Sequence, residues 1–203
     1  MPIDTNPGTS NYAKYATPNP LMRFVIQRFL QRICAEIRWI HPAQIIDVGC
    51  GEGLVAHELQ KLPFRVDYRG FELNPAAVAA ARALNPGLSF TVADLFTLDL
   101  RAEPADLVMQ LEVLEHLERP DLAVAHLATW TRRFALFSVP WEPWFRLGNL
   151  ARGKYLDRLG DHPEHIQHFN HRTFRALLAA HFAEVRVFSC FPWLIGVAQF
   201  PQR

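Results

Sequence analysis

The chain has 203 residues and a formal net charge of +1; half of its residues are hydrophobic and a fifth are charged. This balance excludes fibrous and disordered classes and fits one soluble domain with a sizeable core. A net charge this close to zero does not attract nucleic acid, so we do not expect a nucleic-acid partner. The three cysteines are far apart in the chain, which excludes a disulfide framework and favours a reducing compartment.

The N-terminal region is polar and lacks the basic and apolar segments of a secretory signal. We expect residues 1–19 to form a mobile arm. From Pro20, apolar residues recur at helical spacing, which predicts an N-terminal helix over residues 20–40. No run is long enough to span a membrane, so the expected location is the cytoplasm, with peripheral membrane contact left open.

Short apolar runs alternate with helical patterns through the rest of the chain. This alternation predicts βαβ crossovers, and hence a buried parallel sheet with helices on both faces. The last two runs are too close together for a crossover helix, so they should form an antiparallel hairpin. The expected fold is a doubly wound, seven-stranded, mostly parallel α/β sandwich, a single domain over residues 1–203. The expected strands are residues 44–48, 66–73, 88–93, 105–111, 134–139, 184–190 and 193–200.

A glycine-rich turn follows the first expected strand. Residues 47–53 read Asp-Val-Gly-Cys-Gly-Glu-Gly, and glycines at such a turn let a ligand approach the backbone closely. A dinucleotide fingerprint needs a glycine where this chain has Leu54, which argues against a nicotinamide-dependent oxidoreductase. The acidic Asp47 suits a ligand that carries an ammonium and a sulfonium better than it suits a pyrophosphate.

Acidic residues also end the next three expected strands. Glu72 is placed to accept both hydroxyls of a ribose, and Asp94 to meet an adenine amino group. Glu112 ends the fourth strand. Each residue alone could be a helix cap, but the carboxyl ends of parallel strands share one rim, so together they indicate one ligand site.

Residues 44–139 resemble the core of the class I S-adenosylmethionine (SAM)-dependent methyltransferases. The resemblance is carried by the D-x-G-x-G-x-G turn, Glu72, Ala93-Asp94 and the segment 112–117, and the last two strands match that family's terminal hairpin. It implies methyl transfer from SAM, in which the protein aligns the acceptor and excludes water. The cofactor-binding residues that it implies are Asp47, Gly49, Cys50, Gly51 and Gly53 for the methionine moiety, Glu72 with Leu73 for the ribose, Asp94 with Leu95 for the adenine, and Leu111 with Glu112 at the end of the fourth strand.

The acceptor chemistry points to residues 112–116. Glu112, Glu115 and His116 share one face if a helical turn starts at Glu112. His116 is then a candidate general base for the acceptor proton. A second candidate catalytic residue is His168, in a stretch that holds four histidines between residues 162 and 171.

A metal is the alternative role for these residues. Glu112, Glu115, His116 and His168 could together hold Mg²⁺ or Mn²⁺, which would polarise an acceptor hydroxyl. This pattern is similar to the metal-dependent small-RNA 2′-O-methyltransferases and the ubiquinone-biosynthesis O-methyltransferases, in which a Glu-x-x-Glu-His segment pairs with a histidine before a Phe. His168-Phe169 is the best match for that partner and His165 the second. In the metal-free alternative, Glu115 and His116 only cap and pack the turn or supply the base.

Residues 140–171 form a long insertion after the fifth strand, with aromatic and basic residues interleaved over residues 140–160. We expect a lid over the acceptor pocket; an interfacial membrane helix or a helical hairpin are the alternatives. The expected function is methyl transfer from SAM to an oxygen of a small molecule. Methylation of RNA or protein, and a non-catalytic SAM-binding partner subunit, remain alternatives, and the oligomeric state is open.

Overall fold

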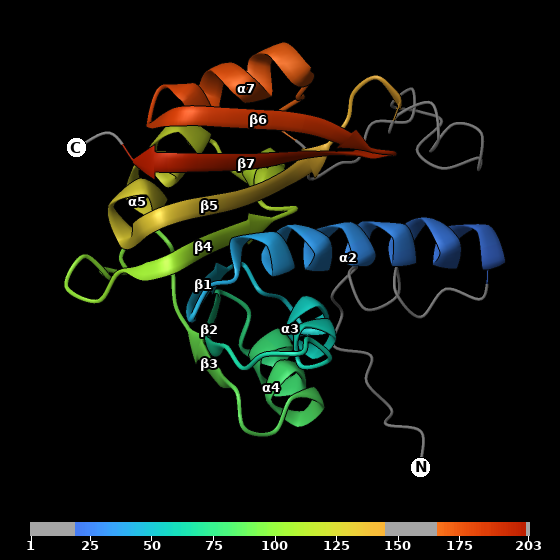
Figure 1. Ribbon diagram of the computed structural model, residues 1–203, viewed down its shortest axis with the longest axis vertical. Helices are drawn as coiled ribbons and strands as arrows, with labels where there is room; N and C mark the ends of the chain where they lie inside the picture. The colour runs from blue at the N-terminus through green and yellow to red at the C-terminus, as the bar shows by residue number, and fades with distance from the viewer. Residues whose placement is uncertain (1–18, 145–165, 202–203) are drawn as a thin grey trace. The chain divides into compact units, whose positions relative to one another are not determined.

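Figure 1 shows the computed structural model, which describes residues 19–144 and 166–201. Seven strands follow one another across the sheet in the order β3-β2-β1-β4-β5-β7-β6. β2 pairs in parallel with β1 and β3, and β4 pairs in parallel with β5. β7 is antiparallel to both β5 and β6. The predicted α/β fold with an antiparallel terminal hairpin is therefore confirmed.

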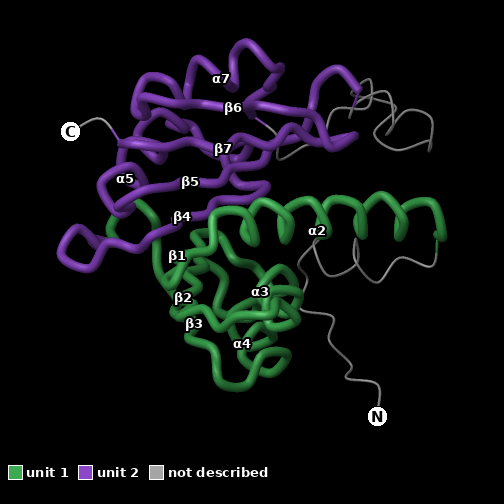
Figure 2. The backbone as a smooth tube through the Cα atoms, in the orientation of Figure 1, with its two compact units in different colours: residues 1–98 green, residues 99–203 purple. Residues whose placement is uncertain are grey.

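The chain divides into two compact units, residues 1–98 and 99–203, which Figure 2 colours separately. The expectation of a single domain over the whole chain stays a prediction. The expected arm, apart from Asn19, and residues 145–165 of the expected lid lie outside the described residues, as does His165.

The first unit places three parallel strands beside three helices. The helix α2 begins after Asn19, whose side chain accepts hydrogen bonds from the amides of Leu21 and Met22. α3 contacts α2 and α4, and α4 contacts β2 and β3. The elements of this unit are α2 (Pro20–Ile40), β1 (Gln44–Val48), α3 (Leu54–Leu59), β2 (Asp67–Glu72), α4 (Pro75–Leu84) and β3 (Ser89–Val92).

The second unit holds the other four strands, with α5 and α7 packed beside them. α7 begins with a capping box in which the side chains of Asn170 and Thr173 bond each other's backbone amides. It packs closely on β7, where a Cβ at Gly196 would lie 2.5 Å from Leu178 Cδ1. The elements are β4 (Ala105–Leu111), the 3₁₀ helix η1 (Leu114–His116), α5 (Pro120–Trp130), β5 (Thr131–Pro140), α7 (His171–Ala179), β6 (Phe182–Cys190) and β7 (Trp193–Pro201).

Within residues 19–144 and 166–201, no helix combines the length and the apolar character that a membrane crossing requires.

Candidate functional site

The glycine-rich turn lies between β1 and α3 and is held against the end of β2. Its three glycines adopt positive φ, with values of 79° at Gly49, 53° at Gly51 and 72° at Gly53. The amides of Gly49 and Cys50 both donate to the carbonyl of Phe71, at 2.7 and 3.2 Å. The turn therefore keeps a left-handed backbone path that other residues rarely adopt.

A buried asparagine closes the turn from the side of α4. Asn85 is fully buried, and its Nδ2 donates to the carbonyls of Gly53 and Ala81, each at 3.0 Å. Its Oδ1 accepts from Gln60 Nε2 at 2.8 Å. A Cβ at Gly53 would lie 2.6 Å from Asn85 Nδ2, so both the positive φ and the close asparagine require glycine there.

The carboxylate of Asp47 is buried beneath this turn, with 2% of the residue exposed. Its Oδ2 accepts a 2.7 Å hydrogen bond from the hydroxyl of Tyr68, whereas Oδ1 is buried and has no hydrogen-bond partner among residues 19–144 and 166–201. Burial raises the pKa of Asp47 to about 7, against the lowering effect of the Tyr68 hydrogen bond. A buried carboxylate oxygen that lacks a donor fits the ammonium group of SAM.

The other acidic residues of the first unit end their strands as expected. Glu72 is half-buried and accepts from the amides of Gly51 at 3.1 Å and Asn74 at 2.9 Å, one on each oxygen. A carboxylate has about four lone-pair sites, so it retains capacity for ribose hydroxyls. Asp94 is exposed and its Oδ1 accepts from the Phe96 amide at 2.9 Å.

The remaining residues implied for the cofactor differ in exposure. Leu73 is 66% exposed, Leu95 and Cys50 are half-buried, and Leu111 is buried. Burial raises the pKa of the Cys50 thiol, which keeps the sulfur protonated at neutral pH. Cys50 therefore contributes its backbone to the turn, and its thiol is not a nucleophile.

Glu112, in the second unit, is held by two side chains that lie far from it in sequence. Its carboxylate accepts from Ser138 Oγ at 3.2 Å and from the indole N–H of Trp193. Its backbone has a φ of 59°, an uncommon conformation for this residue type. No helical turn starts at Glu112, because the 3₁₀ helix begins only at Leu114. The condition under which Glu112 would share a helix face with Glu115 and His116 is therefore not met.

Glu115 and His116 are neighbouring residues that form a charge pair, in which Glu115 is buried and His116 is exposed. Glu115 is 1% exposed, and its Oε1 lies 3.9 Å from His116 Nε2, while 37% of the His116 side chain is exposed. The carbonyl of Glu115 accepts from the amides of Ile166 at 2.9 Å and Gln167 at 3.0 Å. This contact places the segment that carries the exposed His168 against the turn that carries His116.

The four candidate metal ligands do not form a metal-binding group in the described part of the chain. Over residues 19–144 and 166–201, no three His, Cys, Asp or Glu side chains come together in a group that could hold one. The Glu112 carboxylate is engaged by Ser138 and Trp193 instead. A metal site formed by Glu112, Glu115, His116 and His168 stays a prediction.

Sequence reasoning missed four residues of the site: Tyr68, Asn85, Ser138 and Trp193. Each forms a hydrogen bond to a residue 21 to 81 positions away in the sequence. A local sequence pattern does not indicate which distant residue a side chain will contact. The one available signal was a polar residue within an apolar run. Ser138 interrupts the buried strand β5, and a buried polar side chain needs a hydrogen-bond partner.

Comparison with known proteins agrees with this geometry. The model of the methyltransferase domain family matches residues 20–182, so the chain belongs to that family. Together with the seven-stranded sheet and its terminal hairpin, this makes the chain a class I SAM-dependent methyltransferase.

Two curated relatives are named ubiquinone biosynthesis O-methyltransferase. The protein of Nitrosococcus oceani is 33% identical over 40% of this chain and 36% of its own length. That of Colwellia psychrerythraea is 30% identical over 55% of this chain and 48% of its own length. The chain thus spans about half or less of the curated relatives that it matches.

Among solved structures, the chain resembles magnesium protoporphyrin IX methyltransferase from Synechocystis PCC 6803 with bound S-adenosylhomocysteine (SAH). The TM-score is 0.69 at 20% identity, over 93% of this chain and 91% of the other. At this identity the likeness concerns the fold alone.

Proposed function

We propose that this protein transfers the methyl group of SAM to an oxygen of a small-molecule acceptor. The observation that carries the proposal is the pair formed by the exposed His116 and the buried Glu115. This pair lies in the segment that resembles the O-methyltransferases, and the curated relatives described above bear that name.

The first unit supplies the groups that would hold SAM. In this proposal Asp47 Oδ1 accepts the ammonium of the methionine moiety and Glu72 accepts the ribose hydroxyls, which the buried Oδ1 and the half-buried Glu72 carboxylate support. Asp94 follows β3 and would meet the adenine amino group. The bound sulfonium supplies an electrophilic methyl group, so the remaining tasks are alignment of the acceptor and removal of its proton.

His116 is the group proposed to take that proton. Glu115 Oε1 lies 3.9 Å from Nε2, so the carboxylate acts on the imidazole through its charge, and a ring nitrogen of neutral His116 accepts the proton of the acceptor hydroxyl. The buried Glu115 carboxylate then stabilises the imidazolium that forms. A general base of this kind contributes roughly 100- to 10,000-fold to a rate.

The test is methyl transfer from isotope-labelled SAM to matched phenol, catechol, alcohol and amine acceptors, with the methylated atom found by mass spectrometry. We expect O-methyl products, and a kcat about 100-fold lower in His116→Gln with unchanged SAH affinity. The control is His181→Gln, a change at a half-buried histidine that follows the end of α7. Exclusive methylation of amines, RNA or protein, or full activity of His116→Gln, would contradict the proposal.

A further inference from the structure

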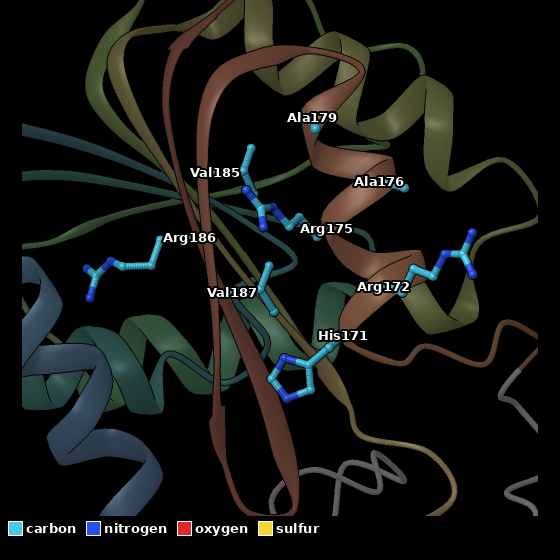
Figure 3. Close-up of a pocket in the computed structure, with 8 residues that line it drawn as sticks. All are labelled: His171, Arg172, Arg175, Ala176, Ala179, Val185, Arg186 and Val187. Atoms are coloured by element: carbon cyan, nitrogen blue, oxygen red, sulfur yellow. The ribbon is translucent and has the colours of Figure 1, made fainter.

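A groove lies between α7 and β6, at the outer edge of the terminal hairpin. Its volume is about 750 Å³, and Figure 3 shows the residues that line it. Ala176 and Ala179 line its helix side, and Val185 and Val187 line its strand side. The small helix side chains leave room along the strand, and the floor is apolar.

The helix side of this groove is positively charged. Arg172 and Arg175 belong to α7, which has no acidic residue, and no acidic residue of the described chain lines the groove. Neither arginine forms an ion pair within residues 19–144 and 166–201. In Figure 3, Arg175 reaches from the helix toward β6 beside Val185, whereas Arg186 extends from the opposite side of the strand. An anionic group in the groove would therefore meet Arg175 first and Arg172 at the rim.

β6 forms the strand side of the groove and is the outermost strand of the described sheet. β6 is the last strand in the sheet order and pairs only with β7 in the described part of the chain. It is nine residues long, and an edge strand of this length presents a row of backbone donors and acceptors. One end of the groove is closed by His171, whose Nε2 lies 3.0 Å from Ser189 Oγ.

We propose that the groove binds an extended acidic segment of a partner protein, which adds to the outer edge of β6 as a further strand. Alternate side chains of an added strand face the same side, about 7 Å apart, and those facing α7 would meet its arginines. Arg172 and Arg175 are separated by about 4.5 Å of helix rise, within reach of two such carboxylates. The position of β6 at the edge of the described sheet favours a peptide over a nucleic acid, because a nucleic acid carries no backbone amides to pair with a strand.

The probe is a fluorescein-labelled twelve-residue peptide of alternating glutamate and threonine, titrated into the full chain and followed by anisotropy. We expect saturable binding that weakens with salt, and a Kd at least about tenfold higher for Arg175→Gln. The matched control is Arg65→Gln, a change at an exposed arginine that does not line the groove, which should stay within about twofold. The same peptide with glutamine in place of glutamate should not bind.

Hydrogen exchange supplies the second measurement. Peptide binding should slow exchange of the β6 amides, and methyltransferase activity and SAH affinity of Arg175→Gln should equal those of the unchanged protein. Three results would overturn the proposal: no saturable binding, binding that leaves β6 exchange unchanged, or tighter Arg175-dependent binding of oligothymidylate than of the peptide.

Discussion

The carboxylate of Asp47 is buried beside Tyr68, and burial raises its pKa to about 7. Near neutral pH the carboxylate is therefore only partly ionised before the cofactor binds. An ammonium group is held best by the ionised form. Cofactor affinity should therefore depend on pH in a range where few carboxylates titrate.

The first prediction concerns this pH dependence. SAH affinity should rise as pH increases from about 6 to about 8 and level off above, because the ionised Asp47 pairs with the ammonium. In Asp47→Asn the affinity should be lower and nearly independent of pH. Calorimetric titration of SAH at several pH values measures both, and an identical pH profile in the two proteins would contradict this role.

The second prediction concerns stability without cofactor. Because the pKa of Asp47 is raised in the folded state, folding binds a proton between about pH 4 and pH 7. The stability that Asp47 contributes is complete below its unfolded pKa and is lost as pH rises through about 7. Asp47→Asn should remove this slope and have the higher free energy of unfolding above about pH 7.

Urea unfolding at a series of pH values compares these proteins. Asp67→Asn, a change at an exposed aspartate of β2, is the control and should keep the slope. A wild-type stability that does not fall between about pH 4 and pH 7 relative to Asp47→Asn would contradict the buried-carboxylate account.

At the scale of elements, the alternation of apolar runs was enough to predict all seven strands. β4 spans the predicted residues, whereas β3 is shorter than predicted by one residue at each end and β5 begins at Thr131 instead of Phe134. Strand ends depend on which neighbour pairs with them, and one sequence does not report that. For the same reason the sequence predicted that acidic residues end the strands, but not that Ser138 and Trp193 hold Glu112.

The third prediction concerns the contact between the glycine-rich turn and α4. Asn85→Ala removes three side-chain hydrogen bonds and leaves the Gly53 carbonyl with the His57 amide as its donor. The free energy of unfolding should fall by about 2–4 kcal/mol, and SAH affinity should fall with it. Gln60→Ala, which removes only the outer bond, should cost less than about 1.5 kcal/mol in urea unfolding. Equal losses in the two variants would contradict a central role for Asn85.

The fourth prediction concerns the contact between β4 and the terminal hairpin. Trp193→Phe keeps a buried ring but removes the indole donor to Glu112. We expect kcat to fall about tenfold, because the Glu112 carboxylate loses one of its fixed partners. Trp130→Phe is the matched control, since Trp130 is equally buried and lies on α5. If Trp130→Phe lowers both kcat and stability as much as Trp193→Phe does, the result would contradict a role for the Trp193 indole in positioning the Glu112 carboxylate.

At the scale of the whole molecule, the family match extends over residues 20–182 and covers part of each compact unit. The class of protein follows from the order of motifs along the chain, which one sequence reports well. The acceptor does not follow, because a pocket is shaped by contacts between residues far apart in sequence. The predicted lid over residues 140–171 lies mostly outside the described residues and stays a prediction.

The central claim is that the turn at residues 47–53 binds SAM and not a dinucleotide. The most direct test is calorimetric titration of the full chain with SAH and, separately, with NAD⁺, with Asp47→Asn as the control. The account predicts saturable one-site binding of SAH, weakened at least about tenfold in the variant, and no binding of NAD⁺. Binding of NAD⁺ without binding of SAH would contradict it.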